Sequence, residues 1–209
     1  MKLRLAALLA LTLVAGCRRP LMDQGGVYAV RSACPIAGVP AGTGDVTLFN
    51  PADSTDSRAI DVTAAISDVR ATCQDAGTDV VSTVTFTVVG LRRDAGPARQ
   101  VVLPYFNVAL QGGGNIAAKR VGQAVLNFAA GDVHAWTRVQ ATVRVNRAVA
   151  TLPENVRQIL TRRRKAGEAD AAVDPLSDPA VRAAVNTATF EHMVGFQLTT
   201  DQLRYNATR

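Results

Sequence analysis

Histidine, cysteine and aspartate are the side chains of this sequence best suited to chemistry, but their spacing matches no common catalytic motif. The two histidines, His134 and His192, belong to no G-x-S-x-G, S-x-x-K or H-E-x-x-H pattern. His134 follows Asp132 at a turn and could form an acid–base pair with it, but neither a nucleophile nor a metal ligand accompanies them. His192 has the same strand parity as Phe190 and Val194, which indicates a partly buried structural residue. We therefore predict no catalytic residue, no metal site and no cofactor.

A second group of residues suits binding better than catalysis. Trp136, Arg138 and Arg144 share the polar face of one alternating segment, and an aromatic ring beside guanidinium groups suits an anionic lipid headgroup or glycan. Two other interpretations stay open: an ordinary solvent face of a sheet, or a face that helices cover. The basic run Arg162–Lys165 is likewise either a solvated helix end or a contact with a membrane or acidic partner.

The elements that position these residues are predicted to be mainly strands. Apolar and polar residues alternate in six long segments, which is typical of half-buried strands; the segments are 59–66, 80–91, 100–110, 117–128, 135–149 and 190–198. The parity of the apolar residues changes after Ser67 and Asp68, which indicates a bulge or turn. Many short alternating strands separated by turns favour an antiparallel β-sandwich, immunoglobulin-like or similar.

The periodicity becomes helical between residues 151 and 188. Thr151 followed by Glu154 is typical of a helix start, and Ser177 or Asp178 could cap a second helix. We predict a two-helix insertion over about 151–188, before the last strand. These helices could form a lid over one end of the sandwich, above an apolar cavity for acyl chains.

The N-terminus has the pattern of a secretion signal. Lys2 and Arg4 form a short positive region, and Leu5–Ala15 is apolar apart from Thr12. The apolar run is shorter than the roughly 20 residues that cross a bilayer as a helix. A short apolar run after a basic start is typical of a cleavable signal peptide.

The segment ends Val14-Ala15-Gly16-Cys17, and this order of small residues before a cysteine resembles the lipobox of bacterial lipoproteins. The resemblance implies that Cys17 receives a diacylglyceryl thioether and that acyl chains such as palmitate anchor the protein. Residues 1–16 are then a signal peptide that is removed, and residues 17–26 a lipidated tether. The other interpretation is an ordinary signal peptide with a chance cysteine.

The same resemblance implies a place in the cell envelope. Arg18 follows Cys17, whereas in lipoprotein families an aspartate at that position favours retention at the inner membrane. We expect the outer membrane, on its periplasmic side, with the inner membrane and the cell surface as alternatives. The tether from Arg18 to Gly26 reaches only about 30 Å when extended, so the folded domain is expected near the membrane.

Cysteine usage then predicts one disulfide. With Cys17 bound to lipid, Cys34 and Cys73 remain as an even pair in an oxidising compartment. A thiol or metal site is the competing interpretation, but no C-x-x-C is present.

Composition indicates one folded domain, residues 27–209. Removal of residues 1–16 from the 209 leaves 193, enough for a real core. With 48% hydrophobic and 19% charged residues, the chain is not of the disordered class. The formal charge of +6 falls to +4 without Lys2 and Arg4, and a mildly basic protein outside the cytoplasm suits anionic lipid or glycan, not nucleic acid.

These features predict a non-catalytic structural or interaction module, anchored to the membrane by its lipid and able to contact other envelope proteins. A carrier or sensor for lipid or glycan is the first alternative, which a cavity between the sheet and the helices would favour. A hydrolase is the second alternative, which a cleft that gathers Asp132, His134 and another polar side chain would favour.

Overall fold

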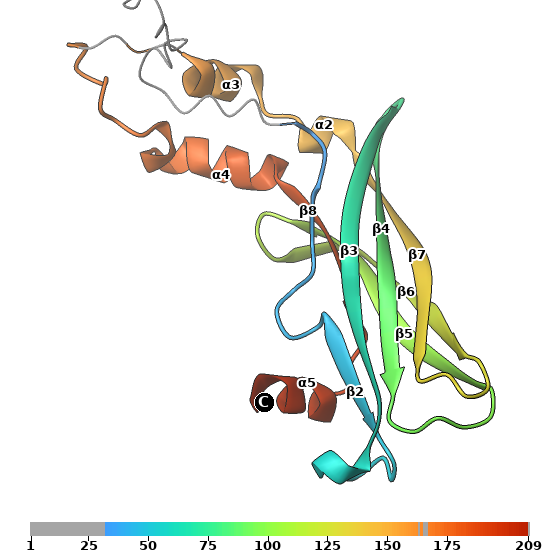
Figure 1. Ribbon diagram of the computed structural model, residues 1–209. Coiled ribbons are helices and arrows are strands. Elements are labelled where there is room, and N and C mark those ends of the chain that lie inside the picture. Colours follow the sequence, from blue (N-terminus) through green and yellow to red (C-terminus); the bar gives the residue numbers. More distant parts are fainter. Residues whose placement is uncertain (1–31, 163, 165–166, 209) are drawn as a thin grey trace, which may run out of the picture.

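The computed structural model describes residues 32–162, 164 and 167–208 of the chain. Strands dominate these residues and form two four-stranded sheets (Figure 1), which confirms the prediction of a mainly β protein. One sheet has the order β1-β8-β5-β6, made of Ile36–Gly38, Phe190–Phe196, Arg99–Gln111 and Asn115–Phe128. The other has the order β2-β3-β4-β7, made of Asp45–Phe49, Ile60–Ala76, Asp79–Arg92 and His134–Asn146.

One hydrophobic core joins the two sheets, and both contribute alternate residues to it. In β4, the side chains of Val84, Phe86 and Val88 are completely buried, whereas the threonines between them are only partly buried. Phe128 and Phe196 come from the facing sheet and are among the largest fully buried side chains. Burying one such ring contributes about 2–3 kcal/mol, so the period-two pattern of the strands accounts for how the sheets hold together.

The change of parity in β3 corresponds to an irregularity in its pairing. The register with β4 shifts between Ser67 and Arg70, and Asp68 has a φ angle of +49°. Aspartate tolerates this left-handed conformation better than most residues. The extra residue turns Val69 toward the core, as the sequence pattern predicts.

One pair of strands differs from the antiparallel expectation. β1 pairs with β8 in parallel, whereas the other pairings are antiparallel. A short hairpin imposes antiparallel pairing on the strands that it connects. Since β1 and β8 lie at opposite ends of the described chain, no such hairpin constrains their direction.

Several short helices gather at one end of the sheets (Figure 1). They lie between β7 and β8 in the sequence, and they are α2 Arg147–Ala150, α3 Glu154–Thr161, the 3-10 turn η3 Pro175–Ser177 and α4 Pro179–Ala188. Helices α3 and α4 fall within the predicted insertion. Asp178 caps α4, since its side chain accepts a hydrogen bond from the Ala180 amide at 2.8 Å. Val156, Val181 and Val185 form a small core between α3 and α4.

The predicted role of Thr151 as a helix cap is wrong. Asn146 caps the additional helix α2 by accepting from the Ala148 amide, and β7 therefore ends at Asn146 instead of continuing to 149. Thr151 then lies just after α2, where its hydroxyl donates to the Arg147 carbonyl at 2.7 Å. Pro153 occupies the cap position of α3 without a side-chain hydrogen bond.

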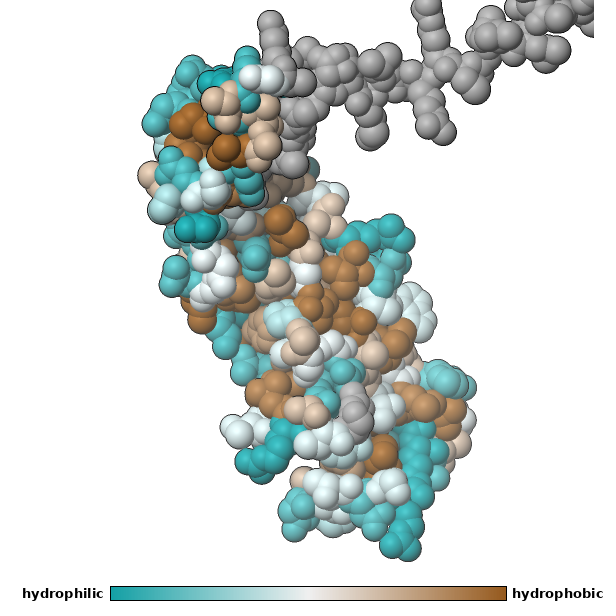
Figure 2. Space-filling view, turned by 90° about the vertical axis from the view of Figure 1, so that its left-hand side faces the viewer, coloured by the Kyte–Doolittle hydropathy of each residue, from teal (hydrophilic) through white to brown (hydrophobic). Residues whose placement is uncertain are grey.

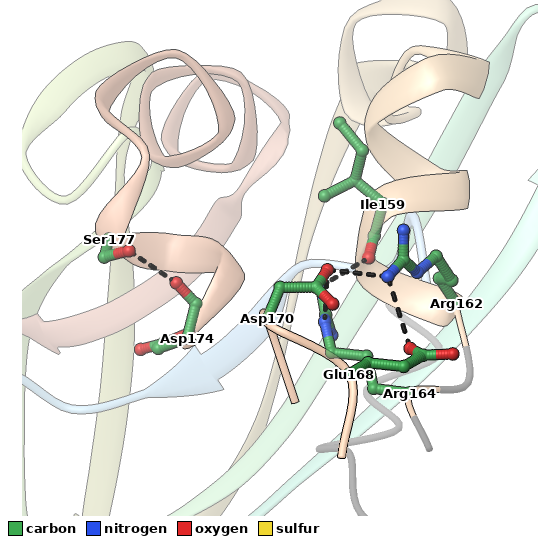
Figure 3. Close-up of polar contacts among 7 residues, drawn as sticks. All are labelled: Ile159, Arg162, Arg164, Glu168, Asp170, Asp174 and Ser177. Carbon is green, nitrogen blue, oxygen red and sulfur yellow. Dashed lines mark hydrogen bonds and ion pairs between the residues drawn. The ribbon is translucent and has the colours of Figure 1, made fainter. Parts of the chain in front are cut away.

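Part of the basic run after α3 is neutralised within the protein (Figure 3). Arg162 lies 2.6 Å from Asp170 and 3.4 Å from Glu168, and Arg164 lies 3.6 Å from Asp170. These two arginines thus hold the connector that leads to η3, where Ser177 donates to the Asp174 carbonyl. Lys165 lies outside the described residues.

Two more short elements complete the fold. The 3-10 turn η2, Ser57–Ala59, leads into β3, and the C-terminal helix α5, Thr200–Thr208, lies against β2 (Figure 1). Tyr205 packs edge-on against Phe49 with ring centroids 5.1 Å apart. The Asn206 side chain donates to the carbonyls of Gly42 and Asp45, each at 2.9 Å. These contacts join the C-terminal helix to residues 42–49 and hold α5 against β2.

Candidate functional site

A cavity lies where the helices meet the end of the sheets, and we call it the end cavity. Its volume is about 440 Å³, and its walls come from four separate segments, 32–36, 150–152, 157–161 and 188–190. The apolar lining consists of Ala33, Ile36, Ala150, Leu152, Leu160, Ala188 and Phe190. Apolar side chains also reach the surface of the helical end and recur along the body of the molecule (Figure 2).

The predicted disulfide is confirmed, and it fixes one wall of the end cavity. Cys34 lines the cavity and is bonded to Cys73, near the end of β3, with the Cα atoms 5.9 Å apart. A second wall is held by a small cluster in which Val145, Ala150 and Phe190 are buried together. Covalent and apolar contacts thus hold the walls to the sheets, as a preformed ligand site requires.

The polar groups at the end cavity are few. Threonines 151, 161 and 189 and Ser32 contribute to the lining, with Arg157 as its charged residue. Arg157 forms a two-point ion pair with Glu154, its Nε lying 2.7 Å from a carboxylate oxygen. Hydrogen bonds from Arg157, and then from Gln158, lower the pKa of Glu154. The end cavity is thus mainly apolar, and its cation already has an anionic partner.

A second hollow opens between β6 and β7, which are edge strands of the two sheets. We call it the edge cleft. Its volume is about 320 Å³, and three cations line it: Lys119, Arg120 and Arg144. Its other lining residues are Asn107, Ala118, Thr142 and Val143.

Behind the edge cleft, a chain of buried polar groups crosses from one sheet to the other. The Asn107 side chain donates to the Thr142 carbonyl at 3.1 Å, and its oxygen lies 2.7 Å from His192 Nε2. The other ring nitrogen, Nδ1, lies 2.9 Å from the Ser82 hydroxyl. Burial lowers the pKa of His192 to about 4, so the ring is neutral at pH 7. The expected structural role of His192 agrees with this arrangement.

The structure places the three residues predicted to form a binding surface along one face of β7. Trp136, Arg138 and Arg144 all point outward from β7, as their parity indicates. Trp136 is 69% exposed, so helices within the described residues do not cover it. Arg144 lines the edge cleft, whereas Trp136 lies opposite Val89 in the sheet.

The sequence does not predict the edge cleft, because its lining residues share no sequence motif. Lys119 and Arg120 lie in β6, and Asn107 lies opposite Arg120 in β5. The alternation of each strand indicates which residues share a face, but not which edge strands lie side by side. The scarcity of lysine, found only at positions 2, 119 and 165, is the single signal that singles out Lys119.

The proposed acid–base pair of Asp132 and His134 does not share a cavity. His134 lines a shallow hollow with Asp45, Thr63 and Leu91, and Asp132 is not part of that lining. Asp132 has a structural contact instead, because its carbonyl accepts from Arg92 Nε at 2.6 Å. Within residues 32–208 as described, no group of three or more His, Cys, Asp or Glu side chains could hold a metal ion.

Cys17, the signal peptide 1–16 and the tether 17–26 lie outside the described residues. Among the helices that are described, none is both long and apolar enough to cross a bilayer.

Comparison with known proteins gives no relative from which a function could be transferred. No protein-family model, curated protein or solved structure matches the chain. Any functional proposal must therefore depend on the end cavity, the edge cleft and the sequence itself.

Proposed function

We propose that this protein is a lipid-anchored envelope protein that binds an acyl chain without chemically changing it. In this proposal Cys17 carries the anchor, the outer membrane holds the protein on its periplasmic side, and the β domain is the binding module. Catalysis and cofactors have no part in it. We also assign the two sheets to an antiparallel β-sandwich of the immunoglobulin-like or a similar type, with β1 as a parallel addition.

The end cavity is the observation that carries the proposal. Its volume of about 440 Å³ lies within the range of about 300–1,000 Å³ typical of small-molecule pockets. Aliphatic and aromatic side chains form most of its wall, and each methylene group removed from water contributes about 0.8 kcal/mol. Because Arg157 is already paired with Glu154, the cavity offers little to a strongly charged ligand and favours a hydrocarbon tail.

The position of the end cavity suits a membrane-derived ligand. Its lining begins at Ser32, fifteen residues after Cys17, and a chain of that length spans at most about 50 Å. An anchored protein would therefore keep the cavity within that distance of the bilayer. An acyl chain could then pass between the two over a short path.

A structural or interaction module is the second candidate. It is supported by an exposed apolar strip on the sheet β2-β3-β4-β7. Val89 and Trp136 lie opposite each other on β4 and β7, and Leu91 lies opposite His134 one step further along. Val89, Leu91 and Trp136 are 42%, 46% and 69% exposed. Aromatic and aliphatic residues exposed together are typical of protein contact surfaces, so another envelope protein could bind here.

Photocrosslinking tests the acyl-chain proposal in the intact protein. Cells that produce the full chain would be supplied with a fatty acid bearing a diazirine, irradiated, and the adducts located by peptide mass spectrometry. We expect adducts in the segments 150–161 and 188–190. Adducts confined to other segments would contradict the proposal.

Two matched alanine substitutions provide the control. Ala188 lines the end cavity, whereas Ala183 is exposed on the same helix α4. Ala188→Phe fills the cavity and should lower the adduct yield severalfold, while Ala183→Phe should leave the yield unchanged. Equal yields in the two variants would show that the label reaches these segments without entering the cavity.

A further inference from the structure

The described arginines fall into two groups, those with carboxylate partners and those without, and the second group is concentrated on the edge strands β6 and β7. Eight arginines form ion pairs with Asp or Glu, and Arg92 donates to backbone carbonyls; the eight are Arg58, Arg70, Arg99, Arg147, Arg157, Arg162, Arg164 and Arg204. Six described cations remain. Four of them lie on β6 or β7, namely Lys119, Arg120, Arg138 and Arg144, and the other two are Arg93 and Arg182. Three of these four line the edge cleft.

We propose that the edge cleft between β6 and β7 binds a phosphate group through Arg120 and Arg144, with Lys119 at its rim. A guanidinium group binds phosphate oxygens with paired, charge-assisted hydrogen bonds. Cations that line a hollow between low-dielectric walls also attract an anion more strongly than the same cations spread over a flat surface.

The floor of the edge cleft supports a ligand more than a purely protective role. Edge strands commonly carry charges to prevent pairing with other chains, and scattered exposed charges would serve that purpose. Here, however, Arg120 lies opposite Asn107 on the inner face of the sheet, and Asn107 is a polar lining side chain that is 7% exposed. The Lys119 ammonium lies on the outer face, 5.8 Å from the centre of the Phe106 ring. His192 and the Thr142 carbonyl hold the Asn107 amide in one orientation, so the floor is rigid and polar.

The phosphate could belong to a lipid headgroup or to a soluble compound, since both present the same oxygens. This inference is independent of the acyl-chain proposal, because the edge cleft and the end cavity share no lining residue. Failure of one would leave the other standing.

Lysine footprinting offers a site-specific test, because Lys119 lines the edge cleft and Lys165 belongs to the separate basic run 162–165 in the sequence. The full protein would be acetylated with a limiting reagent and the modified peptides quantified by mass spectrometry. One arm adds inorganic pyrophosphate. The other compares phosphatidylcholine vesicles with vesicles that also contain phosphatidylglycerol.

We expect acetylation of Lys119 to fall at least threefold with one of the two phosphate sources, while acetylation of Lys165 stays the same. Protection by vesicles alone would assign the site to lipid headgroups, and protection by pyrophosphate as well would extend it to soluble phosphates. Absence of protection in both arms, or equal protection of Lys119 and Lys165, would overturn the proposal.

Charge-matched variants distinguish phosphate binding in the edge cleft from attraction of phosphate by the net positive charge of the protein. Arg120→Gln with Arg144→Gln should abolish the protection of Lys119. Arg93→Gln with Arg182→Gln removes the same charge at two arginines outside the edge cleft that are described without a carboxylate partner, and it should preserve the protection. If both double variants lose protection equally, the effect is one of net charge and the proposed site is wrong.

Discussion

His192 Nε2 lies 2.7 Å from the side-chain oxygen of Asn107, and this contact determines the tautomer of the ring. Asn107 uses its amide nitrogen to donate to the Thr142 carbonyl, so its oxygen faces His192 and Nε2 must be the donor. Nδ1 then accepts from the Ser82 hydroxyl. A neutral imidazole satisfies both contacts, whereas a second proton on Nδ1 would make Nδ1 the donor and force the Ser82 hydroxyl to turn its own proton elsewhere.

Acid should therefore destabilise the protein through His192. Its pKa is about 4 in the folded protein and near 6.5 when unfolded, so the unfolded state binds the proton first. The stabilisation is complete above pH 6.5 and is lost as the pH falls toward 4, by about 3 kcal/mol. Urea unfolding at several pH values gives the free energy of unfolding as a function of pH. Between pH 6.5 and 4 this free energy should fall less steeply for His192→Gln than for the native protein. Parallel slopes would mean that His192 does not titrate as its burial implies.

The disulfide should be a major source of stability. Cys34 and Cys73 are 39 residues apart, and closing a loop of that size stabilises a protein by about 4 kcal/mol in the chain-entropy description. Replacing both with serine should lower the free energy of unfolding by about that amount, measured by urea denaturation. Non-reducing peptide mapping should show the two peptides joined, and recovery of two free thiols would contradict the bond.

Arg92 should matter more for folding than any exposed arginine. It is 4% exposed, and its guanidinium donates to the carbonyls of Gly96, Pro97, Ala129 and Asp132. Arg92→Met would remove the side-chain donor from all four carbonyls, and only those of Gly96 and Ala129 would keep a backbone donor. The expected cost is about 1–3 kcal/mol.

Limited proteolysis should locate the effect of Arg92→Met. We expect faster cleavage within 93–98 and 129–133, the two loops that Arg92 connects. The matched variant Arg93→Met removes a neighbouring exposed arginine and should change neither unfolding nor cleavage. Similar behaviour of the two variants would show that the carbonyl contacts contribute little.

Gly122 should not tolerate a side chain. A Cβ atom at this position would lie 2.5 Å from the Tyr105 hydroxyl and ring, too close for any real contact. Gly122→Ala should therefore destabilise the protein by about 1–3 kcal/mol through overpacking, measured by thermal unfolding. Adding Tyr105→Leu should recover part of that loss relative to Tyr105→Leu alone, and no recovery would place the strain elsewhere.

The anchor can be tested independently of the domain. Cys17→Ala should abolish incorporation of labelled palmitate and release the protein from the membrane fraction, because the thioether would be lost. Cys34→Ser with Cys73→Ser is the matched control, since it removes two thiols and should leave the labelling intact. Unchanged membrane attachment of Cys17→Ala would contradict the lipoprotein interpretation.

The strands were predictable because their side chains alternate between a core and an outer face. In β7 the alternation identifies Ala135, Ala141 and Val143 as buried, and the parity change at Ser67 and Asp68 identifies the bulge. Local signals also limited the cap of α4 to Ser177 or Asp178, and the structure has Asp178. The prediction failed at Thr151, because Asn146 caps an additional helix α2 before it and α3 begins after Pro153 without a side-chain cap.

The candidate sites were harder to predict because they depend on which strands become neighbours. Asn107 and His192 are 85 residues apart in sequence, and nothing local to either indicates the other. The end cavity was anticipated only in outline, as a space below the helices. Its actual walls depend on Ser32, Cys34 and Phe190 meeting at one end of the sheets, a result of tertiary packing.

The direction of the long strands also determines what an anchored molecule presents to its surroundings. Asp79 of β4 lies opposite Asn146 at the helical end, and Leu91 lies opposite His134 at the other. Fourteen residues of β4 extend over about 45 Å. With Cys17 in the membrane and the chain entering at the helical end, the two loops connected by Arg92 would lie at the opposite tip, together with η2. The protein would then act as a spacer of roughly that height, with the exposed strip around Trp136 nearer this tip than the helical end.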